Sequence, residues 1–135
     1  MMLTRTTAKR PRLRHALMPA FVAVLIAALH ALPGRDIAHA SWLDAVHVDK
    51  VVHAAMFAVL AHGVLVGMGK SGLLSRWRWA ATAGCLLYGV VLEAVQGAWC
   101  PGRTADPWDA LADGIGVALA WVTYRWIYRS WPGLA

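Results

Sequence analysis

Nine polar residues of this chain stand at the ends of apolar runs, where ionisable side chains could bind a ligand or transfer a proton. They are Asp49, Lys50, His53, Glu93, Gln96, Arg103, Asp106, Asp109 and Asp113. Carboxylates and a histidine can act as acids, bases or metal ligands, and an arginine can hold a phosphate. Ionisable groups at the edge of a membrane are functional candidates, so we call these nine residues the polar pocket.

The spacing of the pocket residues suits helix faces. Asp49 and His53 are four residues apart in the chain, and Glu93 precedes Gln96 by three. The last three aspartates follow the pattern i, i+3, i+7, which Gly116 continues. Neighbours at these spacings share a helix face, and a small residue on that face lets a second helix approach closely. We therefore expect several segments to deliver polar groups to one level.

The pocket is predicted to be acidic, because five carboxylates stand against Lys50 and Arg103. In a partly desolvated site this excess requires protonated carboxyls, a charged His53, or a bound cation or cationic headgroup. Single residues also have structural interpretations, since Asp106 suits a helix N-cap and Arg103 could only neutralise Glu93. Capping does not require Glu93 and His53 at the same level, so the group as a whole favours a functional site.

The sequence leaves catalysis open. Serine and cysteine nucleophiles are not evident, and Thr104 is the only hydroxyl within the central motif. The spacing H-E-x-x-H is absent, so we predict no metal site, and no cofactor is indicated. We expect His62 to be buried at mid-span, where it packs or bonds to a helix backbone. His30 and His47 are assigned no role.

The composition indicates a membrane protein that positions these residues on helices. Hydrophobic residues make up 59% of the 135-residue chain and charged residues 15%, far from the soluble balance. Four apolar runs predict an all-α, integral membrane four-helix bundle within residues 16–128, between a basic flank at 1–15 and a short tail at 129–135. The predicted helices cover about 16–33, 50–69, 79–97 and 107–127.

The basic residues set the expected orientation. Ten of the thirteen Lys and Arg residues flank one predicted side of the membrane and three the other, so both termini are expected to be cytoplasmic and the polar pocket to face outward. The basic run at 5–14 precedes an apolar segment and no nucleic-acid motif follows, so it predicts contact with anionic lipid and no nucleic-acid partner. Ala38-His39-Ala40 also resembles a signal-peptidase site, but we favour a retained first helix.

The pocket residues fall in three motifs that resemble those of the VanZ-like family of small bacterial membrane proteins. The motifs read Asp49-Lys50-x-x-His53-x-x-x-Phe57, Glu93-x-x-Gln96, and Gly102-Arg103-x-x-Asp106-x-x-Asp109-x-x-x-Asp113-x-x-Gly116. The resemblance covers roughly residues 16–128. The chain departs from the family in having Asp113 where Asn is common, and Ala54 where an aromatic residue is common.

The resemblance implies a multi-pass protein of the inner (cytoplasmic) membrane, acting in the bacterial cell envelope. The family takes its name from a protein associated with low-level resistance to the glycopeptide teicoplanin. We expect the pocket to meet the lipid bilayer and a lipid-linked envelope precursor or lipid headgroup. The alternatives are a membrane-embedded enzyme acting on a lipid phosphate, a proton- or cation-coupled carrier, and a structural bundle without catalysis. The oligomeric state is open.

Overall fold

The computed structural model describes residues 13–32, 48–100 and 104–130, and these residues are all helical or in short connections. A 3-10 turn, η1, covers Leu13–His15. Four α-helices follow: α1 (Leu17–His30), α3 (Val48–Lys70), α4 (Leu74–Trp99) and α5 (Pro107–Tyr128). No strand occurs in the described parts of the chain, which confirms the predicted all-α class.

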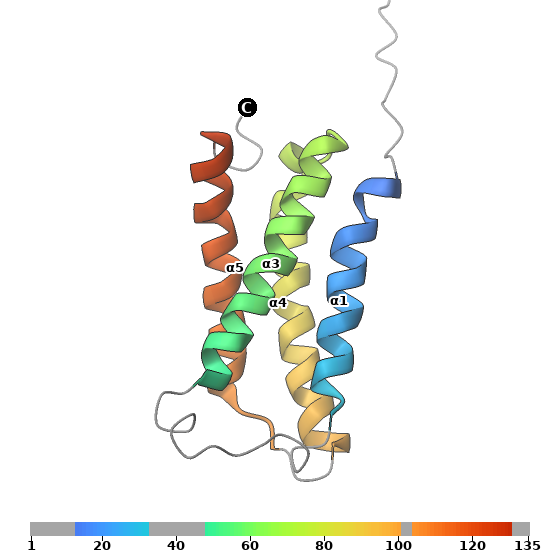
Figure 1. The fold of residues 1–135 in the computed structure, drawn as a ribbon, viewed down its shortest axis with the longest axis vertical. Coiled ribbons are helices and arrows are strands. Elements are labelled where there is room, and N and C mark those ends of the chain that lie inside the picture. The colour runs from blue at the N-terminus through green and yellow to red at the C-terminus, as the bar shows by residue number, and fades with distance from the viewer. Residues whose placement is uncertain (1–12, 33–47, 101–103, 131–135) are drawn as a thin grey trace, which may run out of the picture.

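The helices run alternately up and down in one bundle (Figure 1). The start of α1 and the end of α5 therefore lie at the same end. At the opposite end, α1 and α4 finish where α3 and α5 begin. This arrangement brings the ends of α3, α4 and α5 that carry the described pocket residues, together with the end of α1, to one end of the molecule.

Local sequence explains where α5 begins and ends. Asp106 is in the extended region (φ −110°, ψ 112°), and its side chain accepts a hydrogen bond of 2.9 Å from the Trp108 amide. Pro107 occupies the first turn, where its missing N–H costs nothing. The helix ends at Arg129, which takes a left-handed conformation (φ 52°). The predicted N-cap at Asp106 is thus confirmed.

The connection between α3 and α4 is shorter than predicted. Gly72 adopts a left-handed conformation (φ 70°) and donates to the Gly69 carbonyl, while Leu73 donates to Met68. This pair of bonds is a Schellman motif, which ends a helix abruptly. The chain re-enters a helix at Leu74, so the helix start predicted at about residue 79 was too late. Arginine is a good helix former, and the arginines of that stretch lie in the first turns of α4.

α3 and α5 pack more closely than any other helices among the described residues. Gly116 makes this possible: a Cβ at this position would collide with the Ala54 carbonyl oxygen and lie 2.9 Å from the Ala58 nitrogen. Ala120 continues the contact and is fully buried. The predicted close approach along this face is therefore present. Phe57, Leu65 and neighbouring apolar side chains fill the core between the helices.

Large apolar side chains cover the outside of the bundle. Every described α-helix exposes some of them, including Phe21, Val24, Val59, Leu87, Val90, Ile115, Leu119 and Val122. By length and composition, α3 and α4 are apolar enough to cross a membrane, whereas α1 has 14 residues. Large apolar side chains exposed on every described α-helix suit contact with a membrane or a partner.

Candidate functional site

Lys50 joins three aspartates at the pocket end of the bundle. Its Nζ donates to Asp106 Oδ2 and to Asp109 Oδ1, each at 2.8 Å, and to Asp49 Oδ2 at 3.2 Å. The ammonium, followed by the Trp108 amide N–H, holds the pKa of Asp106 below its ordinary value. These contacts tie the first turn of α3 to the start of α5.

A second link between α3 and α5 lies one turn deeper. His53 Nδ1 is 3.0 Å from Asp113 Oδ1, and His53 Nε2 is 3.9 Å from Asp109 Oδ2. Both His53 and Asp113 are buried. The other carboxylate oxygen of Asp113, Oδ2, has no hydrogen-bond partner among the described residues. It faces Gly89, where an added Cβ would lie only 2.7 Å away, so this glycine makes the room for Asp113.

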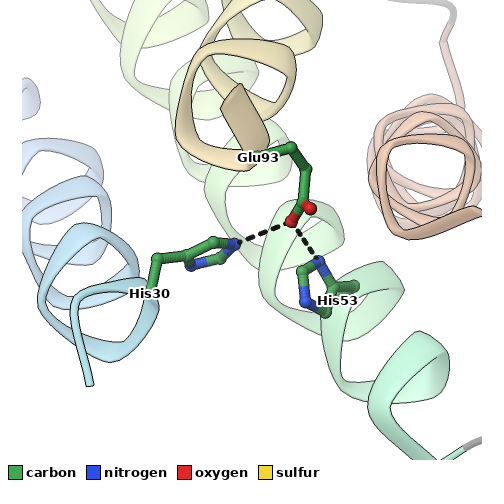
Figure 2. Close-up of side chains that lie close together, drawn as sticks. All are labelled: His30, His53 and Glu93. Carbon is green, nitrogen blue, oxygen red and sulfur yellow. Dashed lines mark ion pairs between the residues drawn. The ribbon is translucent and has the colours of Figure 1, made fainter. Parts of the chain in front are cut away.

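Glu93 brings α4 into the same cluster. Its side chain is buried, and Oε2 accepts a weak hydrogen bond of 3.4 Å from the Asp106 amide. Oε1 has no hydrogen-bond partner among the described residues. It lies 3.6 Å from His30 Nε2 and 3.9 Å from His53 Nδ1, and Figure 2 shows the carboxylate directed between the two imidazole rings.

His30 is the residue of the site that sequence reasoning missed. It is the last residue of α1 and is buried, with its ring centroid 4.9 Å from that of His53. Nδ1 lies 2.9 Å from the Ile26 carbonyl oxygen, which can only accept, so this nitrogen carries a proton. The signal available in the sequence was its position at the end of an apolar run, at the same level as Glu93.

Gln96 positions the end of α1 and does not point into the cluster of charges. Its Nε2 donates to the His30 carbonyl oxygen at 3.1 Å, and the Cys100 thiol donates to the same oxygen at 3.6 Å. Both groups satisfy a carbonyl that the helix end leaves without an intrahelical partner. Gln96 therefore belongs to the site through the placement of His30.

The remaining predicted residues lie outside this buried cluster. The Asp49 side chain is 58% exposed and stands at the rim beside Lys50. Arg103 and His47 lie outside the described residues. His62 is half-buried and bonds to the Thr123 hydroxyl at 2.9 Å, with Tyr124 and Tyr128 beside its ring. The expected full burial and backbone bond are therefore wrong, because α5 offers a side-chain hydroxyl at that depth. The expected packing alternative is present against the two tyrosine rings.

The described site combines five carboxylates, one lysine and two imidazoles, drawn from four helices. Two of its buried carboxylate oxygens lack a hydrogen-bond donor among the described residues. Buried acceptors are nearly always satisfied in proteins, so this arrangement suits a cation, a proton or a cationic ligand. No family model, curated protein or solved structure matches this chain. The chemical role of the site is therefore inferred from the residues of this chain alone.

Proposed function

We propose that this chain is a VanZ-like integral membrane protein of the bacterial cell envelope, whose polar pocket binds a lipid-linked or headgroup-like ligand. The observation that carries the proposal is the gathering of acids, Lys50 and His53 at one end of a bundle with an apolar exterior. A soluble helix presents its polar side to water, whereas here polar groups are inside and large apolar groups outside.

Four spans in the inner membrane, with both termini cytoplasmic, fit the chain best. The alternating direction of the helices returns the end of α5 to the side on which α1 begins (Figure 1). Basic residues are concentrated in the sequence on that side, as cytoplasmic flanks require. The polar pocket then meets the outer leaflet. A 14-residue α1 is short for a bilayer, and local thinning or flanking residues accommodate such helices.

An amine-bearing headgroup is the ligand that the charges favour. The described acids exceed the single lysine, and each Lys50 contact to Asp106 and Asp109 is one that another ammonium could share. Charge-assisted hydrogen bonds from an amine to carboxylates are among the stronger polar contacts. The sequence supplies Arg103 three residues before Asp106 as a partner for a phosphate on the same ligand.

The topology is tested with a membrane-impermeant maleimide on spheroplasts. Cys100 lies at the pocket end and is half-buried, whereas Cys85 is buried in the core and serves as the internal control. We expect labelling of intact spheroplasts that disappears in the Cys100→Ser variant. Labelling only after lysis would place the pocket on the cytoplasmic side and refute an outward-facing site.

Ligand binding is tested by native mass spectrometry of the protein from mixed vesicles of phosphatidylethanolamine and phosphatidylglycerol. We expect wild type to retain the amine-bearing lipid preferentially. Asp109→Asn should reduce that preference roughly tenfold or more, because it removes a charged hydrogen-bonding partner of the amine. Arg103→Ala should weaken the retention of both lipids, since both carry a phosphate. His62→Ala, a change on α3 away from the pocket, is the control. Equal retention of both lipids by wild type would refute headgroup recognition.

A further inference from the structure

We propose that His30, His53 and Glu93 bind a divalent transition-metal ion of the zinc type at the deepest part of the polar pocket. These three residues come from α1, α3 and α4, and all three are buried. The sequence offers no metal-ligand spacing because the ligands are far apart in the chain, and only the packing of three helices brings them together.

The distances suit a single ion. The candidate ligand atoms all lie within 4.8 Å of one another, and Glu93 Oε1 is 3.6 Å from His30 Nε2 and 3.9 Å from His53 Nδ1. Zinc binds nitrogen and oxygen at about 2.0–2.2 Å, so two tetrahedral ligands are about 3.3–3.6 Å apart. The two distances from Glu93 Oε1 are within a few tenths of an ångström of that range, and the two histidine nitrogens, within 4.8 Å of each other, need to close by up to about 1.2 Å.

The hydrogen bonding around His30 and Glu93 leaves two Lewis-basic atoms facing each other, while His53 Nδ1 is bonded to Asp113 Oδ1 at 3.0 Å. In neutral His30 the proton is on Nδ1, because it bonds to the Ile26 carbonyl, and Nε2 therefore presents a lone pair toward Glu93. Glu93 Oε1 is a buried acceptor with no donor in the described part of the chain. Two acceptors facing one another at this distance repel unless a proton or a metal cation lies between them.

The surroundings also resemble the outer shell of a metal site. Metal-binding histidines usually donate their second N–H to a carbonyl or carboxylate, which orients the ring. The Ile26 carbonyl serves His30 in this way. For His53 to bind through Nδ1, its hydrogen bond to Asp113 Oδ1 must break and its proton must move to Nε2, which faces Asp109 Oδ2 at 3.9 Å. The second oxygen of Glu93 is already held by the Asp106 amide.

Two imidazoles and one carboxylate define the class of ion. Nitrogen ligands favour zinc, copper and nickel over magnesium and calcium, which prefer all-oxygen sites. Three protein ligands leave a fourth position, as in zinc sites that also hold water or a substrate. Asp109 and Asp113 add negative charge beside the ion. The inference does not depend on headgroup recognition, since the three ligands need no lipid.

The test uses tag-free, full-length protein in detergent, stripped with a chelator and delipidated. Titration with Zn²⁺ alone, monitored by calorimetry, should show one tight site. His30→Ala, His53→Ala and Glu93→Gln should each weaken binding by more than roughly 100-fold, because even outer-shell changes cost 10–100-fold in metal affinity. His62→Ala, which removes another α3 histidine, should leave the affinity unchanged. Mg²⁺ should not compete.

X-ray absorption of zinc-loaded wild type provides a readout that needs no variant. We expect two imidazoles in the first coordination shell, and a tetrahedral visible spectrum when Co²⁺ replaces zinc. Absence of one-to-one zinc binding by wild type, a shell without imidazole, or equal losses in His62→Ala and His30→Ala would overturn the metal site. The zinc titration contains no lipid, so its outcome is independent of the mass-spectrometry test of lipid preference. Zinc binding without a lipid preference would refute headgroup recognition alone. A lipid preference without zinc binding would refute only the metal site.

Discussion

Replacing Gly116 with alanine should push α3 and α5 apart. The added Cβ would collide with the Ala54 carbonyl oxygen and lie 2.9 Å from the Ala58 nitrogen, and both of these atoms are backbone. Side-chain rotation therefore cannot relieve the contact, and the two helices must separate. Overpacking typically costs about 1–3 kcal/mol, and a rigid backbone neighbour places this case at the upper end, near 3 kcal/mol.

Part of that cost is offset by helix propensity. Alanine in a helix interior is more favourable than glycine by about 1 kcal/mol. The free energy of unfolding is therefore expected to fall by about 2 kcal/mol in total. For a chain of this size that corresponds to a fall in Tm of roughly 6–10 °C. The separation should also lengthen the contacts of Lys50 with Asp109 and of His53 with Asp113, which are 2.8 and 3.0 Å.

Gly84 supplies a matched control, because a Cβ at that position meets nothing within 4 Å. Gly84→Ala keeps the propensity gain without the collision, so it should be neutral or stabilising by about 1 kcal/mol. Thermal unfolding of both variants and of wild type is monitored by circular dichroism in the same detergent. If Gly116→Ala unfolds at the same temperature as Gly84→Ala, the close backbone contact between α3 and α5 is refuted.

Two further predictions concern the pocket end. Gln96→Leu removes the amide that donates to the His30 carbonyl, so the free energy of unfolding should fall by about 1 kcal/mol. Zinc binding should also weaken, because His30 loses its position. A wild-type free energy of unfolding together with wild-type zinc affinity would contradict the positioning role of Gln96. The lowered pKa of Asp106 means that its bonds to Lys50 and Trp108 stabilise the fold above the ordinary aspartate pKa of about 4 and lose that effect as pH falls through the lowered value. Asp106→Asn should therefore flatten the acid limb of the stability–pH curve, and an unchanged limb would exclude this contribution.

Local sequence determines the helices of this protein and several of their ends. The four apolar runs predict four helices because each is long, apolar and bounded by turn-forming or charged residues. The Asp106-Pro107 cap acts within one turn and needs no tertiary contact. The predicted start of α4 at about residue 79 is too late, because Gly72 ends α3 so sharply that the connection is only three residues long and the arginines that follow it are helical.

Tertiary packing decides which pocket residues meet. The rotation of each helix about its axis is set by contacts with its neighbours, such as the close approach at Gly116, and spacing along one helix does not reveal it. Asp49 and His53 share a predicted face, yet one is exposed and the other buried. His30 bonds to the Ile26 carbonyl within α1, and it is the packing of α1 against α4, two helices that run in the same direction, that places it beside Glu93. Helical periodicity thus determines which residues can share a face, whereas the packing of the four helices decides which faces share a site.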